Sequence, residues 1–276
     1  MMKNATSVQA VDLGAVKARQ QVTWSDGNYS VIGSTLSLIS EVLVANVDPQ
    51  AGWRVLDVAT GNGNTALAAA RCGCEVTGVD YVPALLADGR RRAQADGLTV
   101  TFLEGDAEAL DFPDAGFDAV LSTLGVMFAP DQEKTAGELL RVCRSGGRIG
   151  LANWTPGGFV GQMLKVIGRH VPPPSGVRSP ALWGTEERIH ELLGGGSSSL
   201  TTKVRQFVFR YRSPEQWLSV FRTYYGPMVR AFASLPADGQ DSLADDLLGL
   251  ARSMNRATGP MIAVPSDYLE VVAVRA

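Results

Sequence analysis

The chain has 276 residues, enough for one large α/β domain or for one domain with a cap. Its composition is that of a folded globular protein, with 45% hydrophobic and 19% charged residues. The formal net charge of -3 supplies no basic surface and argues against nucleic acid as a partner.

Strands and helices are expected to alternate from about residue 53 to about residue 154, the pattern of a doubly wound sheet. The expected strands cover residues 53–58, 75–79, 99–103, 117–123 and 148–153. A helix is expected to begin at Asn64, which can cap it, and two more to cover residues 83–96 and 131–143.

After Trp154, glycine and proline interrupt this pattern. We expect helices near residues 159–169 and 186–193, and a surface loop at the glycine- and serine-rich residues 194–199. A half-exposed strand is expected at 203–211. It is followed by a helix that begins with a capping box at Ser213 and carries aromatic residues from Trp217 to Met228, and by a last strand at 268–274.

Two observations bear on cellular location and metals. No apolar run approaches the roughly 20 residues of a membrane-spanning helix, and the first six residues lack a signal peptide's apolar core. The cysteines at 72, 74 and 143 do not have the spacing of a redox or zinc pair, and the two histidines are scattered. We therefore expect a cytoplasmic protein with small buried thiols and no metal site.

The segment VLDVATGNGN, residues 55–64, is the most informative in the chain. It predicts a buried strand, an acidic residue, a glycine turn and a helix, which is a nucleotide-type site. Gly61, Gly63 and Ala66 loosely match the dinucleotide fingerprint, with Asp80 near the spacing of a ribose-binding acid. Asp57 discriminates between a dinucleotide and a methionine-type ligand, because its carboxylate would repel a pyrophosphate but attract an ammonium or a sulfonium. Its alternative role is that of an internal acid that orders the loop.

This segment resembles the first motif of the class I S-adenosylmethionine-dependent methyltransferases. The most similar members are small-molecule enzymes akin to the ubiquinone/menaquinone-biosynthesis C-methyltransferases. Four further segments resemble the family's later motifs, in the family's order: VDYV (79–82), EGDAEAL (104–110) followed by FP (112–113), FDAVLST (117–123) and LLRVCRSGGR (139–148).

The resemblance implies a Rossmann-like, seven-stranded mixed sheet with the last strand antiparallel, helices on both faces and an α-helical cap. It implies an N-terminal helical lid (1–50), an S-adenosylmethionine-binding core (51–154), a cap insertion (155–202), and a segment (203–276) whose strands and aromatic cap helices complete the core domain. The cofactor would be S-adenosylmethionine, with S-adenosylhomocysteine as product.

The motifs also imply roles for single residues. Asp80 would accept hydrogen bonds from the ribose diol and Asp106 from the adenine amino group. Backbone N–H groups of the glycine turn would hold the carboxylate. Trp24 and Tyr29 would cover the cofactor, or alternatively pack an N-terminal helix. Ala59 stands where the family often has glycine. The full set of expected cofactor contacts is Trp24, Tyr29, Asp57, Ala59, Gly61, Gly63, Asp80, Tyr81, Gly105, Asp106, Ala107, Glu108, Ser122 and Thr123.

Methyl transfer requires in-line approach of the acceptor, so the main tasks are alignment and exclusion of water. The candidate catalytic residues are His170, Tyr224 and Asn153, with His170 as a possible base or a structural loop residue. Further acceptor-side candidates are Trp154, Trp183, Trp217 and Tyr225. The predicted function is methylation of a small, partly apolar or aromatic molecule by a monomer or homodimer. A nicotinamide-dependent oxidoreductase and a catalytically silent S-adenosylmethionine-binding protein are the alternatives.

Overall fold

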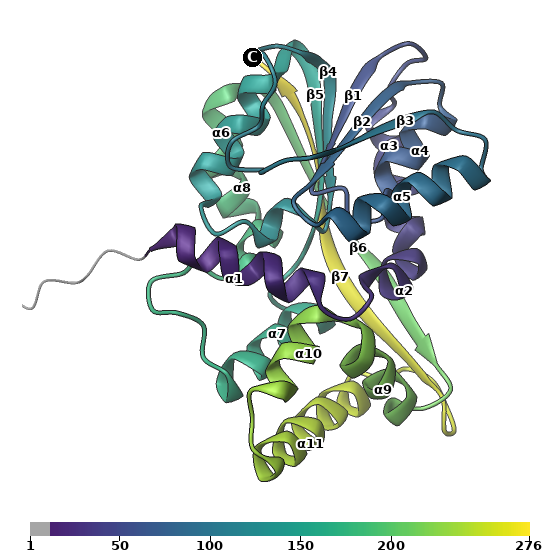
Figure 1. The fold of residues 1–276 in the computed structure, drawn as a ribbon, viewed down its shortest axis with the longest axis vertical. Helices are drawn as coiled ribbons and strands as arrows, with labels where there is room; N and C mark the ends of the chain where they lie inside the picture. Colours follow the sequence, from purple (N-terminus) through teal and green to yellow (C-terminus); the bar gives the residue numbers. More distant parts are fainter. Residues whose placement is uncertain (1–11) are drawn as a thin grey trace, which may run out of the picture.

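A computed structural model describes residues 12–276, whose strands form one sheet in the order β3-β2-β1-β4-β5-β7-β6 (Figure 1). The strands are β1 (Arg54–Val58), β2 (Glu75–Asp80), β3 (Val100–Glu104), β4 (Phe117–Thr123), β5 (Cys143–Trp154), β6 (Ser197–Tyr211) and β7 (Ile262–Arg275). Strands β1 to β5 pair in parallel, and β7 is antiparallel to both β5 and β6. The predicted mixed sheet with an antiparallel last strand is therefore confirmed.

Helices cover both faces of this sheet, as predicted (Figure 1). On one face lie α3 (Ser37–Val47), α4 (Asn64–Arg71) and α5 (Pro83–Ala95), and on the other α6 (Gln132–Val142) and α8 (Glu186–Leu193). Gly150 of β5 marks the closest approach of α3, because an added Cβ would lie 2.4 Å from the Val47 side chain. Fully buried Leu43, Leu56 and Leu121 belong to the hydrophobic core.

The cap lies at one end of the sheet (Figure 1). It consists of α7 (Phe159–His170), α9 (Pro214–Tyr224), α10 (Gly226–Ala233) and α11 (Ala237–Ser253). Strands β6 and β7 pair from Ser197 with Arg275 to Tyr211 with Ile262. This long antiparallel pair extends beyond β1 to β4 into the cap and joins it to the sheet.

Two helices precede α3. They are α1 (Leu13–Ser25) and α2 (Tyr29–Gly33), and a 3-10 turn, η1 (Ser34–Leu36), leads from α2 into α3. Three further 3-10 turns are η2 (Val126–Phe128), η3 (Pro180–Gly184) and η4 (Gly194–Gly196). The N-cap of α1 is Asp12, whose side chain accepts a hydrogen bond from the Ala15 N–H.

Two expectations about the second half of the chain were wrong, and one helix was missed. Residues 194–199 are not a surface loop, because η4 leads directly into β6, where Ser197 pairs with Arg275. The aromatic helix is not continuous to residue 228, because the chain turns at Tyr225 and a new helix, α10, begins at Gly226 with Pro227 in its first turn. The helix that was not predicted is α11.

The expectation about apolar runs also fails within the described residues. The helical stretch Tyr29–Val47 has 19 residues and a mean hydropathy of 1.5, so by length and composition it could span a membrane. Its apolar residues have another use, because Ile39, Leu43 and Val44 are buried in the core, and η1 interrupts the stretch. Such a stretch is weak evidence for a membrane span, since a core helix can have the same length and apolar composition.

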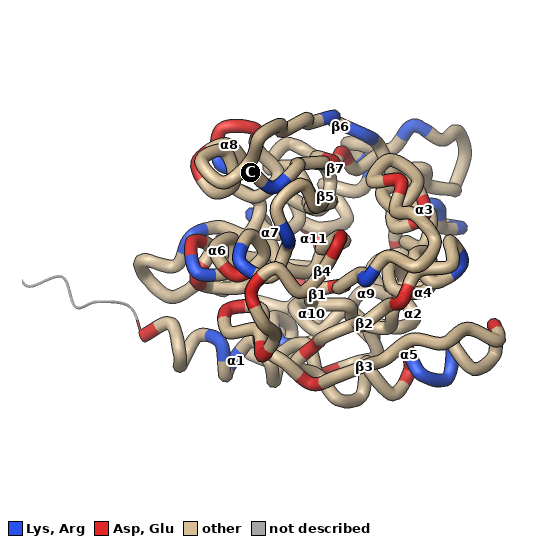
Figure 2. Tube along the Cα trace, turned by 90° about the horizontal axis from the view of Figure 1, so that it is seen from above, with Lys and Arg blue, Asp and Glu red and all other residues tan. Residues whose placement is uncertain are grey.

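Charges of both signs occur on α5, α6 and α8, whereas the charged residues of α1 are the basic Lys17 and Arg19 (Figure 2). All three cysteines are free. Cys74 and Cys143 are buried as expected, but Cys72 is exposed, because it lies in the turn that ends α4. Within residues 12–276, no group of three or more histidine, cysteine or acidic side chains could hold a metal ion.

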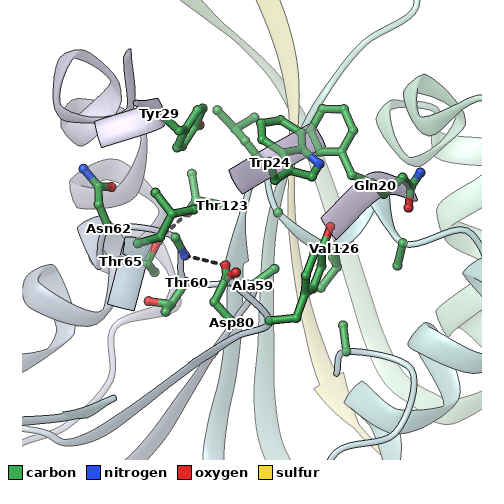
Figure 3. A pocket seen from close by; sticks show the side chains of 18 of the residues that line it. Gln20, Trp24, Tyr29, Ala59, Thr60, Asn62, Thr65, Asp80, Thr123 and Val126 are labelled. Atoms are coloured by element: carbon green, nitrogen blue, oxygen red, sulfur yellow. Dashed lines mark hydrogen bonds between the residues drawn. The ribbon is translucent and has the colours of Figure 1, made fainter. Parts of the chain in front are cut away.

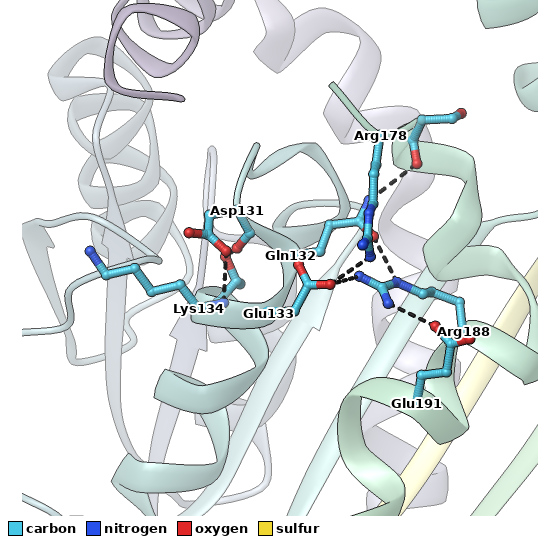
Figure 4. A network of polar contacts seen from close by, with 9 residues as sticks. Asp131, Gln132, Glu133, Lys134, Arg178, Arg188 and Glu191 are labelled. Atoms are coloured by element: carbon cyan, nitrogen blue, oxygen red, sulfur yellow. Dashed lines mark hydrogen bonds and ion pairs between the residues drawn. The ribbon is translucent and has the colours of Figure 1, made fainter. Parts of the chain in front are cut away.

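A polar network ties the proline-rich segment after α7 to the start of α6 (Figure 4). The buried Arg188 guanidinium donates to the Gln132 amide oxygen at 2.9 Å and to Glu133 and Glu191 at 2.7 Å each. Gln132 in turn donates to the Ser179 carbonyl at 3.1 Å. The network fixes the N-terminus of α6. Ala129 and Pro130, just before this helix, line a cavity at the carboxyl ends of the parallel strands.

Candidate functional site

The main cavity, of about 890 Å³ including the space open to solvent, lies at the carboxyl ends of the parallel strands. The segments that follow β1, β2, β3 and β4 line it, and α1 and α2 contribute Trp24 and Tyr29. Figure 3 shows Trp24 and Tyr29 on the side of the cavity opposite Asp80 and Ala59. This is the edge where ligands bind in doubly wound sheets.

The turn after β1 is built from left-handed backbone. Ala59, Gly61 and Gly63 have φ of 54°, 56° and 86°. Gly63 is required on a second ground, because an added Cβ would lie 2.9 Å from the Phe102 ring. Ala59 adopts this conformation although it carries a Cβ, at a cost of roughly 1–2 kcal/mol.

Asp57 orders this turn from beneath. Its Oδ2 accepts hydrogen bonds from the Thr60 hydroxyl at 2.5 Å and from the Ala66 N–H at 3.0 Å. Its Oδ1 is buried and has no partner among the described residues. Burial raises the pKa of Asp57 to about 7, and the nearby Asp80 carboxylate adds to this shift. The turn-ordering alternative for Asp57 therefore has a geometric basis.

Asp80 ends β2 at the floor of the cavity. Its carboxylate accepts from the N–H groups of Gly61 and Val82, both at 2.9 Å. Burial raises the pKa of Asp80 to about 6. Two buried carboxylates suit a ligand that brings hydroxyl and ammonium donors and disfavour a diphosphate, so these residues fit S-adenosylmethionine better than a dinucleotide.

The helix α1 crosses the cavity and is attached to it by polar contacts. Lys17 Nζ lies 2.5 Å from Asp106 Oδ2 and 2.7 Å from Glu108 Oε2. The Gln21 side chain donates to the Tyr81 carbonyl at 2.6 Å. Val16 is the one residue of α1 that is fully buried, so α1 is held by these polar contacts together with the packing of Trp24.

The structure brings most of the predicted cofactor residues to this cavity. Those that line it are Trp24, Tyr29, Ala59, Gly61, Asp80, Tyr81, Asp106, Ala107, Glu108 and Thr123. Those that do not line it are Asp57, Gly63, Gly105 and Ser122. Of these, Ser122 acts within the fold, because its hydroxyl donates to the Val58 carbonyl at 2.7 Å and accepts from the Val126 N–H at 3.1 Å.

Several lining residues were not predicted. Thr60, Asn62 and Thr65 lie within or next to the glycine-turn motif, so their position in that motif was an available signal. Lys17 and Gln20 carried no such signal, because they belong to a helix whose packing over the sheet is set by tertiary contacts.

A second cavity, of about 310 Å³ including the space open to solvent, adjoins the first, and we call it the aromatic chamber. Both cavities share Trp24, Tyr29, Leu36, Leu124 and Phe128. The other residues that line the chamber are Ile32, Trp154, Val160, Met163, Phe209, Phe221 and Tyr225. Among residues 12–276, no charged side chain lines the chamber.

Trp24 is at the centre of the shared wall. Its ring centroid lies 5.4 Å from that of Tyr29, 4.8 Å from Phe128 and 5.6 Å from Tyr225, in each case edge-to-face. Such contacts between aromatic rings stabilise a defined arrangement beyond burial alone. The two cavities therefore meet at a rigid aromatic boundary.

The predicted catalytic residues are not brought to either cavity. His170 ends α7, and its Nε2 lies 2.9 Å from Asp246 Oδ2 of α11, which holds the ring away from the cavities. Tyr224 ends α9 outside both linings, because the chain turns there. Asn153 is fully buried, with neither side-chain polar atom partnered among the described residues, and lines neither cavity.

Of the other acceptor-side candidates, Trp154 and Tyr225 line the aromatic chamber. Trp183 and Trp217 are fully buried in the core and line neither cavity. Core packing therefore accounts for Trp217.

Comparisons with known proteins agree with the geometry. Residues 55–147 match the family model described as a methyltransferase domain. An uncharacterized protein of Mycobacterium tuberculosis is 41% identical over 224 residues, which are 80% of this chain and 81% of that protein. A demethylmenaquinone methyltransferase of Deinococcus radiodurans is 30% identical over 230 residues, 75% of this chain and 88% of that enzyme.

A solved structure shows the same fold. It is the Haemonchus contortus phosphoethanolamine N-methyltransferase 2 in complex with phosphomonomethylethanolamine and S-adenosylhomocysteine. The TM-score is 0.55 at 18% identity, and the match covers 86% of this chain and 52% of that one.

Proposed function

The chain belongs to the class I S-adenosylmethionine-dependent methyltransferases, with S-adenosylmethionine as its cofactor, and on that premise we propose that it methylates a small, uncharged acceptor that is largely apolar or aromatic. The aromatic chamber carries this proposal. An ionic acceptor would lose its hydration there without gaining a charged partner, which is unfavourable. The demethylmenaquinone methyltransferase relatives make demethylmenaquinone one acceptor to test.

We propose that the main cavity holds the cofactor through the contacts that the sequence motifs imply. Asp80 would accept from the ribose hydroxyls and Asp106 from the adenine amino group. The glycine turn at Gly61 would approach the methionine portion through its backbone. Asp57 lies outside the cavity lining, so we propose that it acts on the cofactor through the turn that it orders by its hydrogen bonds with Thr60 and Ala66.

When bound, the cofactor supplies a methyl group attached to a sulfonium sulfur. The sulfur leaves as a neutral thioether and needs no proton to do so. The chain's contribution is then alignment and exclusion of water. Trp24 and Tyr29 line both cavities and would set the direction from which an acceptor in the chamber approaches. An uncharged acceptor must lose a proton when it is methylated, and because His170 lies against Asp246 rather than at the cavities, we propose that this proton passes to solvent.

We also propose the division of the chain inferred from sequence: a lid (1–50), a cofactor-binding core (51–154), a cap insertion (155–202) and completing strands and cap helices (203–276). The polar attachment of α1 over the cavity supports the lid, although its first residues, 1–11, lie outside the described part. The free thiols of Cys72 and Cys74, two residues apart, support a cytoplasmic location. A monomer or homodimer stays a prediction.

The proposal is tested by measuring S-adenosylhomocysteine formation with two acceptors under anaerobic conditions. Product is expected with 1,4-dihydroxynaphthalene, an uncharged aromatic probe, and not with phosphoethanolamine. The variant Asp80→Ala should lose S-adenosylmethionine affinity by calorimetry and, with it, turnover. Turnover with phosphoethanolamine alone would contradict the proposed acceptor class.

Two further results would contradict a methyltransferase role. Binding of S-adenosylhomocysteine without turnover across a broad set of uncharged acceptors would favour a silent binding protein. Binding of NAD in preference to S-adenosylhomocysteine would favour an oxidoreductase, which the comparisons do not.

A further inference from the structure

Tyr225 places a hydroxyl-bearing side chain in the wall of the aromatic chamber. It lies at the junction of α9 and α10, where its N–H donates to the Phe221 carbonyl at 2.9 Å and its carbonyl accepts from the Met228 N–H at 2.8 Å. The residue is 5% exposed. Its backbone is therefore fixed at the point where the chain turns.

The ring of Tyr225 is fixed as well. Its centroid lies 5.6 Å from Trp24, 5.5 Å from Phe221 and 6.5 Å from Tyr29. These rings come from α1, α9 and α2, so three separate elements hold Tyr225. A hydroxyl on so constrained a ring is preorganised to meet a ligand.

No hydrogen bond among residues 12–276 satisfies this hydroxyl, and burial together with the neighbouring Tyr29 raises its pKa above the usual range for tyrosine. The group therefore stays protonated at neutral pH and can donate. A ligand oxygen in the chamber could accept a hydrogen bond from this hydroxyl. Trp183 and Trp217 have buried polar atoms without a partner among the described residues, but these two residues line neither cavity.

We propose that the Tyr225 hydroxyl donates a hydrogen bond to a hydroxyl or carbonyl oxygen of the acceptor and so determines which uncharged aromatic molecules bind productively. This rests on the proposed function, because it assigns the chamber to the acceptor. Tyr29 also faces the main cavity, whereas Tyr225 lines only the chamber. An acceptor anchored at Tyr225 would therefore lie in the chamber beside the shared wall, because Tyr225 packs against Trp24 and Tyr29.

The test uses 1-naphthol and naphthalene, which differ by one hydroxyl, as probes of the protein saturated with S-adenosylhomocysteine. Binding is measured by calorimetry. One recovered hydrogen bond predicts that 1-naphthol binds about tenfold more tightly than naphthalene. In Tyr225→Phe this preference should fall to about one, with the affinity for naphthalene retained.

A matched control is Tyr211→Phe. Tyr211 also packs against Phe221, at 6.4 Å between centroids, but lies outside the chamber, so the preference should persist. A preference that survives in Tyr225→Phe, or one that disappears only in Tyr29→Phe, would overturn the assignment. Failure of both probes to bind the loaded wild-type protein would also overturn it.

Affinity for S-adenosylhomocysteine separates the two proposals and reports folding. It should be the same in wild type, Tyr225→Phe and Tyr211→Phe. Its absence in wild type would contradict the proposed function, whereas an altered probe preference with intact affinity concerns Tyr225 alone.

Discussion

The buried carboxylates of Asp57 and Asp80 predict that cofactor affinity and stability respond to pH in opposite directions. Asp80 can accept two ribose hydroxyls only when ionised, and its pKa is raised to about 6. At pH 5 about one molecule in ten carries that carboxylate ionised. The affinity for S-adenosylhomocysteine should therefore fall about tenfold between pH 8 and pH 5, or about 1.4 kcal/mol.

The stability of the free protein should change with pH in the opposite direction. The folded-state pKa of Asp57, about 7, lies above its ordinary value of 3.8, so the native state binds more protons than the unfolded state between these values. Stability then rises as pH falls through 7, because a buried charge is removed. From pH 8 to pH 5 the gain from Asp57 is on the order of 3 kcal/mol, with a smaller one from Asp80.

Carboxylates that are paired with arginine make the protein less stable as pH falls, but they do so at lower pH. Ion pairs with arginine lower the pKa of Glu133 and Glu138 below their ordinary value of 4.5. The stability that they contribute is present above that value and is lost as pH falls through the lowered pKa. The window from pH 8 to pH 5 therefore reports mainly the two buried carboxyls.

Calorimetry with S-adenosylhomocysteine and urea unfolding of the free protein, both at pH 8, 7, 6 and 5 and constant ionic strength, measure these two responses. Asp80→Asn should bind weakly at every pH, without the slope. Asp57→Asn should lose most of the pH dependence of stability. An affinity that is flat from pH 8 to pH 5, or a free protein that is less stable at pH 5, would refute the reasoning.

Three further predictions concern the lid, the polar network and the glycine turn. Lys17→Met should weaken affinity for S-adenosylhomocysteine several-fold and speed its release in stopped-flow measurements, because α1 loses its attachment, whereas Lys165→Met on the exposed side of α7 should not. Arg188→Met should lower the free energy of unfolding in urea by about 1–3 kcal/mol, because a buried glutamine loses its partner, and Arg178→Met, which is half exposed, should lower it by less than about 1 kcal/mol. Ala59→Gly should raise the free energy of unfolding by about 1 kcal/mol without loss of cofactor affinity, since glycine accepts φ of 54°. An unchanged midpoint of urea unfolding would contradict backbone strain at Ala59.

The sheet was predictable because its strands are short, apolar and separated by capped helices. Each strand from β1 to β5 overlaps the range expected from sequence. The helix α11 was missed because its buried side is a narrow stripe of Leu243, Leu247 and Ala251 among acidic and small residues. The first part of β6 was missed because its serines are held by pairing with β7 rather than by their own strand propensity.

The same contrast holds for the site. Asp80 and Gly61 belong to contiguous motifs, so local spacing was enough to nominate them, and both line the main cavity. His170 and Tyr224 were nominated by residue type alone. Their positions depend on where α7 and α9 end within the cap, which no local pattern specifies.

The origin of the chamber's wall has an evolutionary consequence. Of its residues, only Leu124 and Phe128 fall within the conserved-domain match at 55–147, and the others lie before or after it. Apart from Trp24, Tyr29 and Leu36, which line both cavities, substitutions in these flanking residues can change which acceptor fits without altering the lining of the cofactor cavity. Divergence among homologues should accordingly concentrate in the flanking regions, and grafting those regions between paralogues is a direct route to altered selectivity.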